Sequence, residues 1–231
     1  MTDLEAEQIV IWYQNLEAQL ETFLTTIPLS YENRNIHLPL LAPLVVEAGS
    51  LIDTIFRKKF LAPSADKKKL NIEDFACHFE ERYKLSQMKS LLFQYPPRYL
   101  TPFEGWTSIK TGNYVEKKWW TNYNHIKHNR IEKYNLATLG EAASIICALQ
   151  QIVSILPTFT RALWRHDLLN AVHNVHYVGQ NIEESQIRYF GMVETRLFAT
   201  PIGHERFPPN IEDITPFWFG GKKLAKFLGR A

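Results

Sequence analysis

A long amphipathic helix is predicted at residues 138–156 by the sequence TLGEAASIICALQQIVSIL. Thr138, with Glu141 three residues later, forms the capping-box pattern that begins many helices. Apolar residues then recur at the three- and four-residue spacing of one helix face: Ala142, Ile145, Ile146, Leu149, Ile152, Val153 and Leu156. Pro157 ends or kinks the helix, because proline has no N–H and clashes with the preceding turn.

The same periodicity predicts further helices on both sides of this segment. Their ranges are 3–27, 39–60, from 71 onward, 114–134 and, beyond the proline, 159–175. Residues 88–113 are rich in aromatic side chains, so this connection is expected to pack over the helices as a lid or a partner surface. Apolar and polar residues alternate at 186–200, which indicates a short strand or hairpin.

Together these elements predict an all-α fold, an up-down bundle of four to five helices. The bundle is expected to occupy residues 1–165. Residues 166–231 are then expected to form an irregular C-terminal extension that holds the short hairpin.

Composition limits the classes of function. The chain has 231 residues, of which 45% are hydrophobic and 13% aromatic, enough to form a buried core. Its formal net charge of +2 does not by itself indicate a polyanion partner, so nucleic-acid binding would require local clustering of cations. Cys77 and Cys147 lack the spacing of a zinc or disulfide motif. The N-terminus is acidic and no apolar run approaches the roughly 20 residues of a membrane span, so the protein is predicted to be soluble, cytoplasmic and without membrane contact.

Residues 119–130, WWTNYNHIKHNR, combine aromatic, amide, imidazole and cationic side chains within about three helical turns. Side chains three and four residues apart share a helix face. One such stripe contains Trp120, Asn124, Lys127 and His128, and its neighbour contains Tyr123, Lys127, Arg130 and Tyr134. A base, a cation and an amide would project together, which is typical of a phosphate or RNA site.

Each of these residues has a candidate role and an ordinary structural alternative. His128 could act as general acid or base, with Asn124 orienting its imidazole. Lys127 and Arg130 could neutralise phosphate charge, or could be solvated helix cations. Two aromatic residues, Trp120 and Tyr123, could stack on bases or belong to the core. Glu47, near the buried face of the 39–60 helix, could pair with either cation as a structural ion pair or orient the catalytic group.

Metal and cofactor sites are not predicted. The pairs His125/His128 and His173/His176 have three-residue spacing, whereas helical zinc pairs prefer four, and no HExxH motif accompanies them. Glycine-rich phosphate loops are also absent from the sequence.

Residues 38–156 resemble the HEPN family, the higher-eukaryote and prokaryote nucleotide-binding domain. The resemblance rests on LAPLVVEAGSL at 41–51, on the WW-xx-YN-xx-KH-x-R pattern at 119–130, and on Ala137-Thr138-Leu139 leading into a helix. It implies a helical bundle that forms homodimers and acts as a metal-independent endoribonuclease with an Arg-x4–6-His motif. It also implies a toxin–antitoxin or other defence system, with RNA and an antitoxin or other protein as partners.

No arginine precedes His128 at the family spacing, whereas Arg161 and His166 do satisfy Arg-x4-His. The predicted function is RNA binding with metal-independent cleavage of the RNA. His128 would be the acid or base, Lys127 and Arg130 would bind phosphate, and Asn124 would position the imidazole. The alternatives are a non-catalytic HEPN-like module that binds RNA or a protein partner, and a purely structural helical subunit.

Overall fold

The computed structural model describes residues 1–60, 70–107, 114, 116–173, 190–202, 207–214 and 222–229. Its helices are α1 (Asp3–Thr26), α2 (Leu41–Lys59), α3 (Ile72–Tyr83), α4 (Lys118–His128), α5 (Arg130–Lys133), α6 (Leu139–Ile155), α7 (Thr160–Arg165) and α9 (Lys222–Phe227). Its strands are β1 (Ser90–Leu92), β2 (Arg98–Leu100), β3 (Leu169–His173), β4 (Phe190–Glu194) and β5 (Phe198–Ile202). The strands form one antiparallel sheet in the order β2-β1-β5-β4-β3.

The prediction of an all-α bundle is wrong, because a five-stranded sheet covers the helices and the fold is mixed α/β. Strands β1 and β2 lie in the connection 88–113, and β3 begins where the helix predicted at 159–175 should have continued. The helix there, α7, ends at Arg165. These strands have three to five residues, and β1 and β5 are buried at every position, so neither shows the alternation that identifies a strand.

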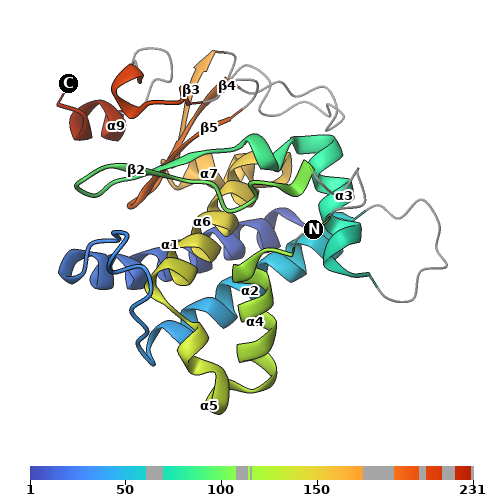
Figure 1. Ribbon diagram of the computed structural model, residues 1–231. Coiled ribbons are helices and arrows are strands. Elements are labelled where there is room, and N and C mark those ends of the chain that lie inside the picture. The colour runs from blue at the N-terminus through green and yellow to red at the C-terminus, as the bar shows by residue number, and fades with distance from the viewer. Residues whose placement is uncertain are drawn as a thin grey trace.

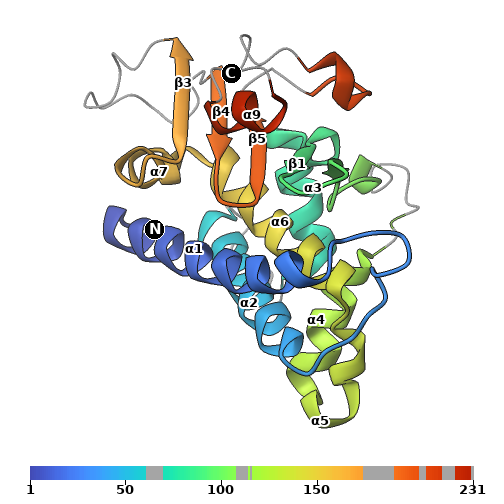
Figure 2. The ribbon, with the colours of Figure 1, turned by 90° about the vertical axis from the view of Figure 1, so that its left-hand side faces the viewer.

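Helix α6 has α1 and α2 on one side and the strands on the other (Figure 2). Two buried glutamines on α6 face the sheet. The Gln150 Oε1 atom accepts a hydrogen bond from Thr200 of β5 at 2.7 Å, and Gln151 Nε2 donates to Ser90 of β1 at 3.0 Å. Burying amides requires such partners, so these bonds fix how the sheet sits on α6.

Strands from both sides of the predicted boundary at residues 165/166 pair in this one sheet. Leu91 and Leu92 of β1 lie opposite Ala199 and Phe198 of β5. The strand β1 is therefore flanked by β2 on one edge and by a strand of the predicted C-terminal extension on the other (Figure 1).

Several local predictions are confirmed. Helix α6 begins at the predicted cap Thr138. The helices predicted at 3–27 and from 71 onward are present as α1 and α3, with Thr2 and Asn71 as their side-chain caps. The hairpin predicted at 186–200 is present as β4 and β5, while residues 186–189 lie outside the described residues. The single helix predicted at 114–134 is instead interrupted at Asn129, whose φ of −146° and ψ of 70° are not helical. Within the described part of the chain, no single helix is long and apolar enough to cross a membrane.

Candidate functional site

The predicted RNA site lies on α4 and α5, which form the end of the molecule farthest from the sheet (Figure 1). Its cationic side chains point to solvent: His125, Lys127, His128, Arg130 and Lys133 are all exposed. Asn124 is half-buried. In the described part of the chain neither His128 nor Asn124 has a side-chain hydrogen-bond partner, so nothing there fixes the tautomer or the orientation of the imidazole.

The aromatic half of the motif faces inward. Trp120 is 6% exposed and Tyr123 is 1% exposed, with their ring centroids 5.2 Å apart. A Cβ atom at Gly49 of α2 would lie 2.3 Å from the Tyr123 ring, so the two helices touch at this point. Lys127 Nζ donates to the Tyr123 hydroxyl at 2.9 Å and lies 5.2 Å from the ring centroid. The aromatic residues therefore attach α4 to α2, and neither ring presents a face on which a base could stack.

Two of the predicted residues meet in a cleft between α1, α2 and α5. Glu47 of α2 and Arg130 of α5 line a hollow of about 330 Å³ together with Trp12 of α1. Trp12 is 53% exposed. In the described residues no ion pair joins Glu47 and Arg130, so both charged groups are available to a ligand in the cleft.

Trp12 falls on the apolar face of the helix predicted at 3–27, so the sequence pattern predicts a buried side chain there and not a site residue. A signal was available, because Trp12 and Tyr13 are adjacent and neighbouring residues on a helix point about 100° apart. Trp12 lies at the edge of the apolar face of the helix and Tyr13 near its centre, so the indole can stay partly exposed. The structure buries Tyr13, whose hydroxyl donates to Thr195 at 3.0 Å, and this leaves Trp12 in the cleft.

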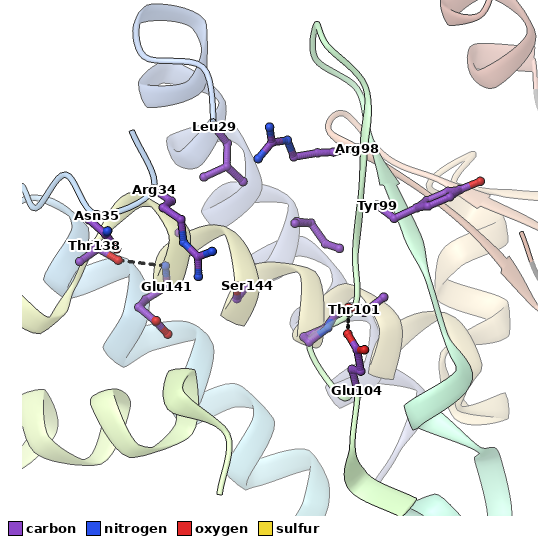
Figure 3. Close-up of a pocket in the computed structure, with 13 residues that line it drawn as sticks. Leu29, Arg34, Asn35, Arg98, Tyr99, Thr101, Glu104, Thr138, Glu141 and Ser144 are labelled. Atoms are coloured by element: carbon purple, nitrogen blue, oxygen red, sulfur yellow. Dashed lines mark hydrogen bonds between the residues drawn. The ribbon is translucent and has the colours of Figure 1, made fainter. Parts of the chain in front are cut away.

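A second cavity, of about 440 Å³, lies between the α1–α2 connection, β2 with its following turn, and the first turn of α6 (Figure 3). Its charged lining residues are Arg34, Arg98, Glu104 and Glu141. They come from three distant segments of the chain, and no short motif contains all of them. Their spacing in the sequence therefore does not indicate that they lie together.

Among the described residues, the remaining histidine motifs of the sequence lie outside both cavities. Arg161 pairs with Asp3 at 2.5 Å, while His166 Nε2 lies 3.1 Å from Glu7 Oε1, so the Arg-x4-His segment attaches α7 to α1. His125 is exposed, the backbone of His173 ends β3, and His176 lies outside the described residues. Across the part of the chain that the structure describes, no three histidine, cysteine, aspartate or glutamate side chains come together as a metal site would require.

Compared with protein-family models, with curated proteins and with solved structures, this chain matches none of them.

Proposed function

We propose that this chain binds single-stranded RNA, without cleaving it, in the cleft between α1, α2 and α5 and on the exposed cations beside that cleft. The observation that carries the proposal is the meeting of an arginine, a glutamate and a half-exposed tryptophan ring around one hollow, at the end of the molecule where the other exposed cations of α4 and α5 also lie.

The three side chains suit the three parts of a nucleotide. The planar guanidinium of Arg130 can bind a phosphate through two parallel hydrogen bonds. The indole of Trp12 offers a stacking face, and such stacking contributes about 1–3 kcal/mol per base. Glu47 can accept hydrogen bonds from the amino group of a base, as carboxylates do with cytosine. Its negative charge would repel a second phosphate, so the cleft suits one nucleotide.

Neighbouring cations would bind the phosphates of the RNA strand outside the cleft. Lys127, His128 and Lys133 are exposed on the same two helices as Arg130. Glu132 is the acid among them, and its carboxylate accepts a hydrogen bond from Asn129 at 2.6 Å. Because the net positive charge is small, we expect modest affinity that weakens as salt rises.

The surroundings of His128 favour binding over cleavage. A general base must be held within hydrogen-bond reach of the proton it removes, and ordinarily a second group orients it. His128 is exposed, and no described side chain orients it. We also propose the cytoplasm as the compartment, because Cys77 and Cys147 are both thiols. The homodimer and the antitoxin partner remain predictions.

Binding can be measured by fluorescence anisotropy, with a labelled RNA of about 12 nucleotides in EDTA at rising salt. We expect Trp12→Ala and Arg130→Gln each to weaken binding about tenfold or more. The matched control is Lys226→Gln, which removes one exposed charge from α9 at the opposite end of the molecule and should leave affinity nearly unchanged.

Two results would contradict the proposal. One is a wild-type protein that binds no RNA at low salt; the other is an equal loss in all three variants. The same samples, run on a denaturing gel, report cleavage. RNA that is cut by the wild type and left intact by His128→Ala would replace this proposal with metal-independent endoribonuclease activity.

A further inference from the structure

The cavity between the α1–α2 connection, β2 and α6 has walls that hydrogen bonds hold in place. Gln94, just after β1, bonds both the N–H and the carbonyl of Leu29, at 3.0 and 2.6 Å. The N–H of Leu139 donates to the Ile36 carbonyl and that of Gly140 to the Arg34 carbonyl, both at 2.8 Å. The connection is thereby attached to the β1–β2 hairpin at one end and to α6 at the other.

Close packing against α6 sets the position of Arg34. A Cβ atom on Gly140 would lie 2.9 Å from the Arg34 carbonyl oxygen, so only glycine allows this approach. The first backbone N–H groups of α6 already donate hydrogen bonds, two to the α1–α2 connection and one within the cap, where the Glu141 N–H donates to the Thr138 hydroxyl at 3.3 Å. An anion in the cavity would therefore be bound by side chains and not by the helix N-terminus.

The four charged side chains of the cavity differ in whether they are already paired. Glu141 is 7% exposed and pairs with Lys118 at 3.2 Å, and the Glu104 carboxylate accepts a hydrogen bond from Thr101 at 2.8 Å. The guanidinium groups of Arg34 and Arg98 have no hydrogen-bond or ion-pair partner in the described part of the chain. The Nε atom of Arg98 is moreover buried without a partner. Of the four charged side chains, the two without a partner among the described residues are therefore both positive; Arg34 is exposed to solvent, and Arg98 is partly buried.

The two arginines project into the same space from opposite walls. Figure 3 shows the side chain of Arg98 reaching from β2 toward the α1–α2 connection, and that of Arg34 reaching from the connection toward α6. The ring of Tyr99, the next residue on β2, points away from the cavity, where it stacks on Phe207 with centroids 5.5 Å apart. One further acid lies near: the pKa of Glu32 is lowered, chiefly by a hydrogen bond from Ser30 and in smaller part by the charge of Arg98.

We propose that this cavity is a binding site for a small organic anion, whose carboxylate or phosphate group is held between Arg34 and Arg98. Guanidinium groups bind both of these anions through paired hydrogen bonds. The volume of about 440 Å³ falls in the usual range for a small-molecule pocket. Glu141 and Glu104 line the remaining space and would accept hydrogen bonds from hydroxyl or amino groups elsewhere on the ligand. This site is separate from the proposed RNA cleft and does not depend on it.

The test is isothermal titration of the full chain with citrate and, separately, with inorganic phosphate, at constant ionic strength. We expect saturable binding of at least one of the two anions. Tighter binding of citrate would indicate that the cavity prefers a carboxylate ligand, and tighter binding of inorganic phosphate that it prefers a phosphate. The double variant Arg34→Gln with Arg98→Gln should bind about tenfold to a hundredfold more weakly. The conservative pair Arg34→Lys with Arg98→Lys keeps the charge but loses the paired geometry, so its affinity should fall between these two.

Lys226→Gln is the control, because it removes one exposed positive charge from α9, outside both the cavity and the RNA cleft, and should leave anion binding unchanged. Circular dichroism of each variant checks that it is folded. Absence of saturable binding by wild type, or equal binding by the glutamine double variant and wild type, would overturn the proposal. So would a double variant that loses RNA affinity while it retains anion affinity, since the two arginines would then belong to the RNA surface.

Discussion

At the scale of single residues, the close contact between α2 and α4 requires glycine at position 49, because the Tyr123 ring occupies the place of a side chain. A Cβ atom there would lie 2.3 Å from Cδ2 and 2.4 Å from Cγ of Tyr123, a ring that is 1% exposed. We expect Gly49→Ala to lower the free energy of unfolding by about 1–3 kcal/mol, because the buried ring must shift. Urea unfolding measures the change.

The effect of helix propensity has the opposite sign, since alanine is about 1 kcal/mol better than glycine inside a helix. A stabilised Gly49→Ala protein would therefore show that the ring is not packed on α2. The control is the same substitution in a Tyr123→Leu background, where a smaller side chain relieves the clash. The cost of Gly49→Ala should shrink there, and equal costs in both backgrounds would refute the contact.

At the scale of elements, α1 is attached to the β4–β5 turn through the buried carboxylate of Glu17. This carboxylate accepts hydrogen bonds from the N–H of Leu197 at 2.8 Å, from the N–H of Arg196 at 3.3 Å, and from the Thr195 hydroxyl. Burial raises its pKa, while the hydrogen bonds from Thr195, Leu197, Tyr13 and Arg196 lower it in part. Burial has the larger effect, so the folded protein holds a proton on Glu17 more firmly than the unfolded chain does.

From this pKa we predict the pH dependence of the Glu17 contribution. Between the ordinary glutamate pKa and the raised folded pKa, the folded state binds more protons than the unfolded state, so stability falls as pH rises. The contribution of Glu17 is complete below the ordinary pKa and is lost as pH rises through the folded one. The loss is about 1.4 kcal/mol for each unit by which the pKa is raised.

Urea unfolding of wild type and Glu17→Gln, from acid to neutral pH, isolates this contribution, because the other titrating groups cancel in the difference. The advantage of wild type over the variant should be largest at low pH and decline toward neutrality. An advantage that grows with pH would mean that the hydrogen bonds to the carboxylate outweigh its burial.

The elements also show what sequence can and cannot predict here. Helices α1, α2, α3 and α6 were predicted, since each repeats apolar residues over several turns and most begin at a side-chain cap. Strand β1 has three buried residues and pairs with β2 and with β5, and β5 lies far from it in the sequence. Gln150 and Gln151 could have indicated a second buried surface on α6, because two adjacent glutamines within an apolar helix require partners.

The two candidate sites differ in the same way. The cationic motif of α4 and α5 is local in sequence, so its exposed side chains could be predicted as a group. The predicted pairing partner Glu47 does reach the cleft of Arg130, though no ion pair joins them in the described residues. The pair Arg34 and Arg98 is brought together only by Gln94, Gly140 and the β1–β2 hairpin, and no spacing rule encodes that arrangement.

At the scale of the whole molecule, both halves of the chain complete each other's buried surfaces. Strand β5 covers one edge of β1, Thr200 satisfies Gln150, and the turn before β5 satisfies Glu17. Residues 1–165 alone would leave these polar groups and the sheet-facing side of α6 exposed. Exposed polar groups can bond water, so the main cost is the lost apolar burial, about 1.5–3 kcal/mol for each large side chain. A few such losses are comparable with the whole stability of a domain.

We therefore predict that the fragment 1–165 does not fold cooperatively, whereas the full chain unfolds in a single transition. Far-UV circular dichroism and the fluorescence of the buried Trp106, Trp119 and Trp120 should give coincident urea curves for the full chain. The matched control is the chain 1–214, which lacks α9 but keeps every strand of the sheet and should retain a cooperative transition at lower urea. If fragment 1–165 unfolded at the midpoint of the full chain, the helices would be an independent domain and the sheet a separate unit resting on it.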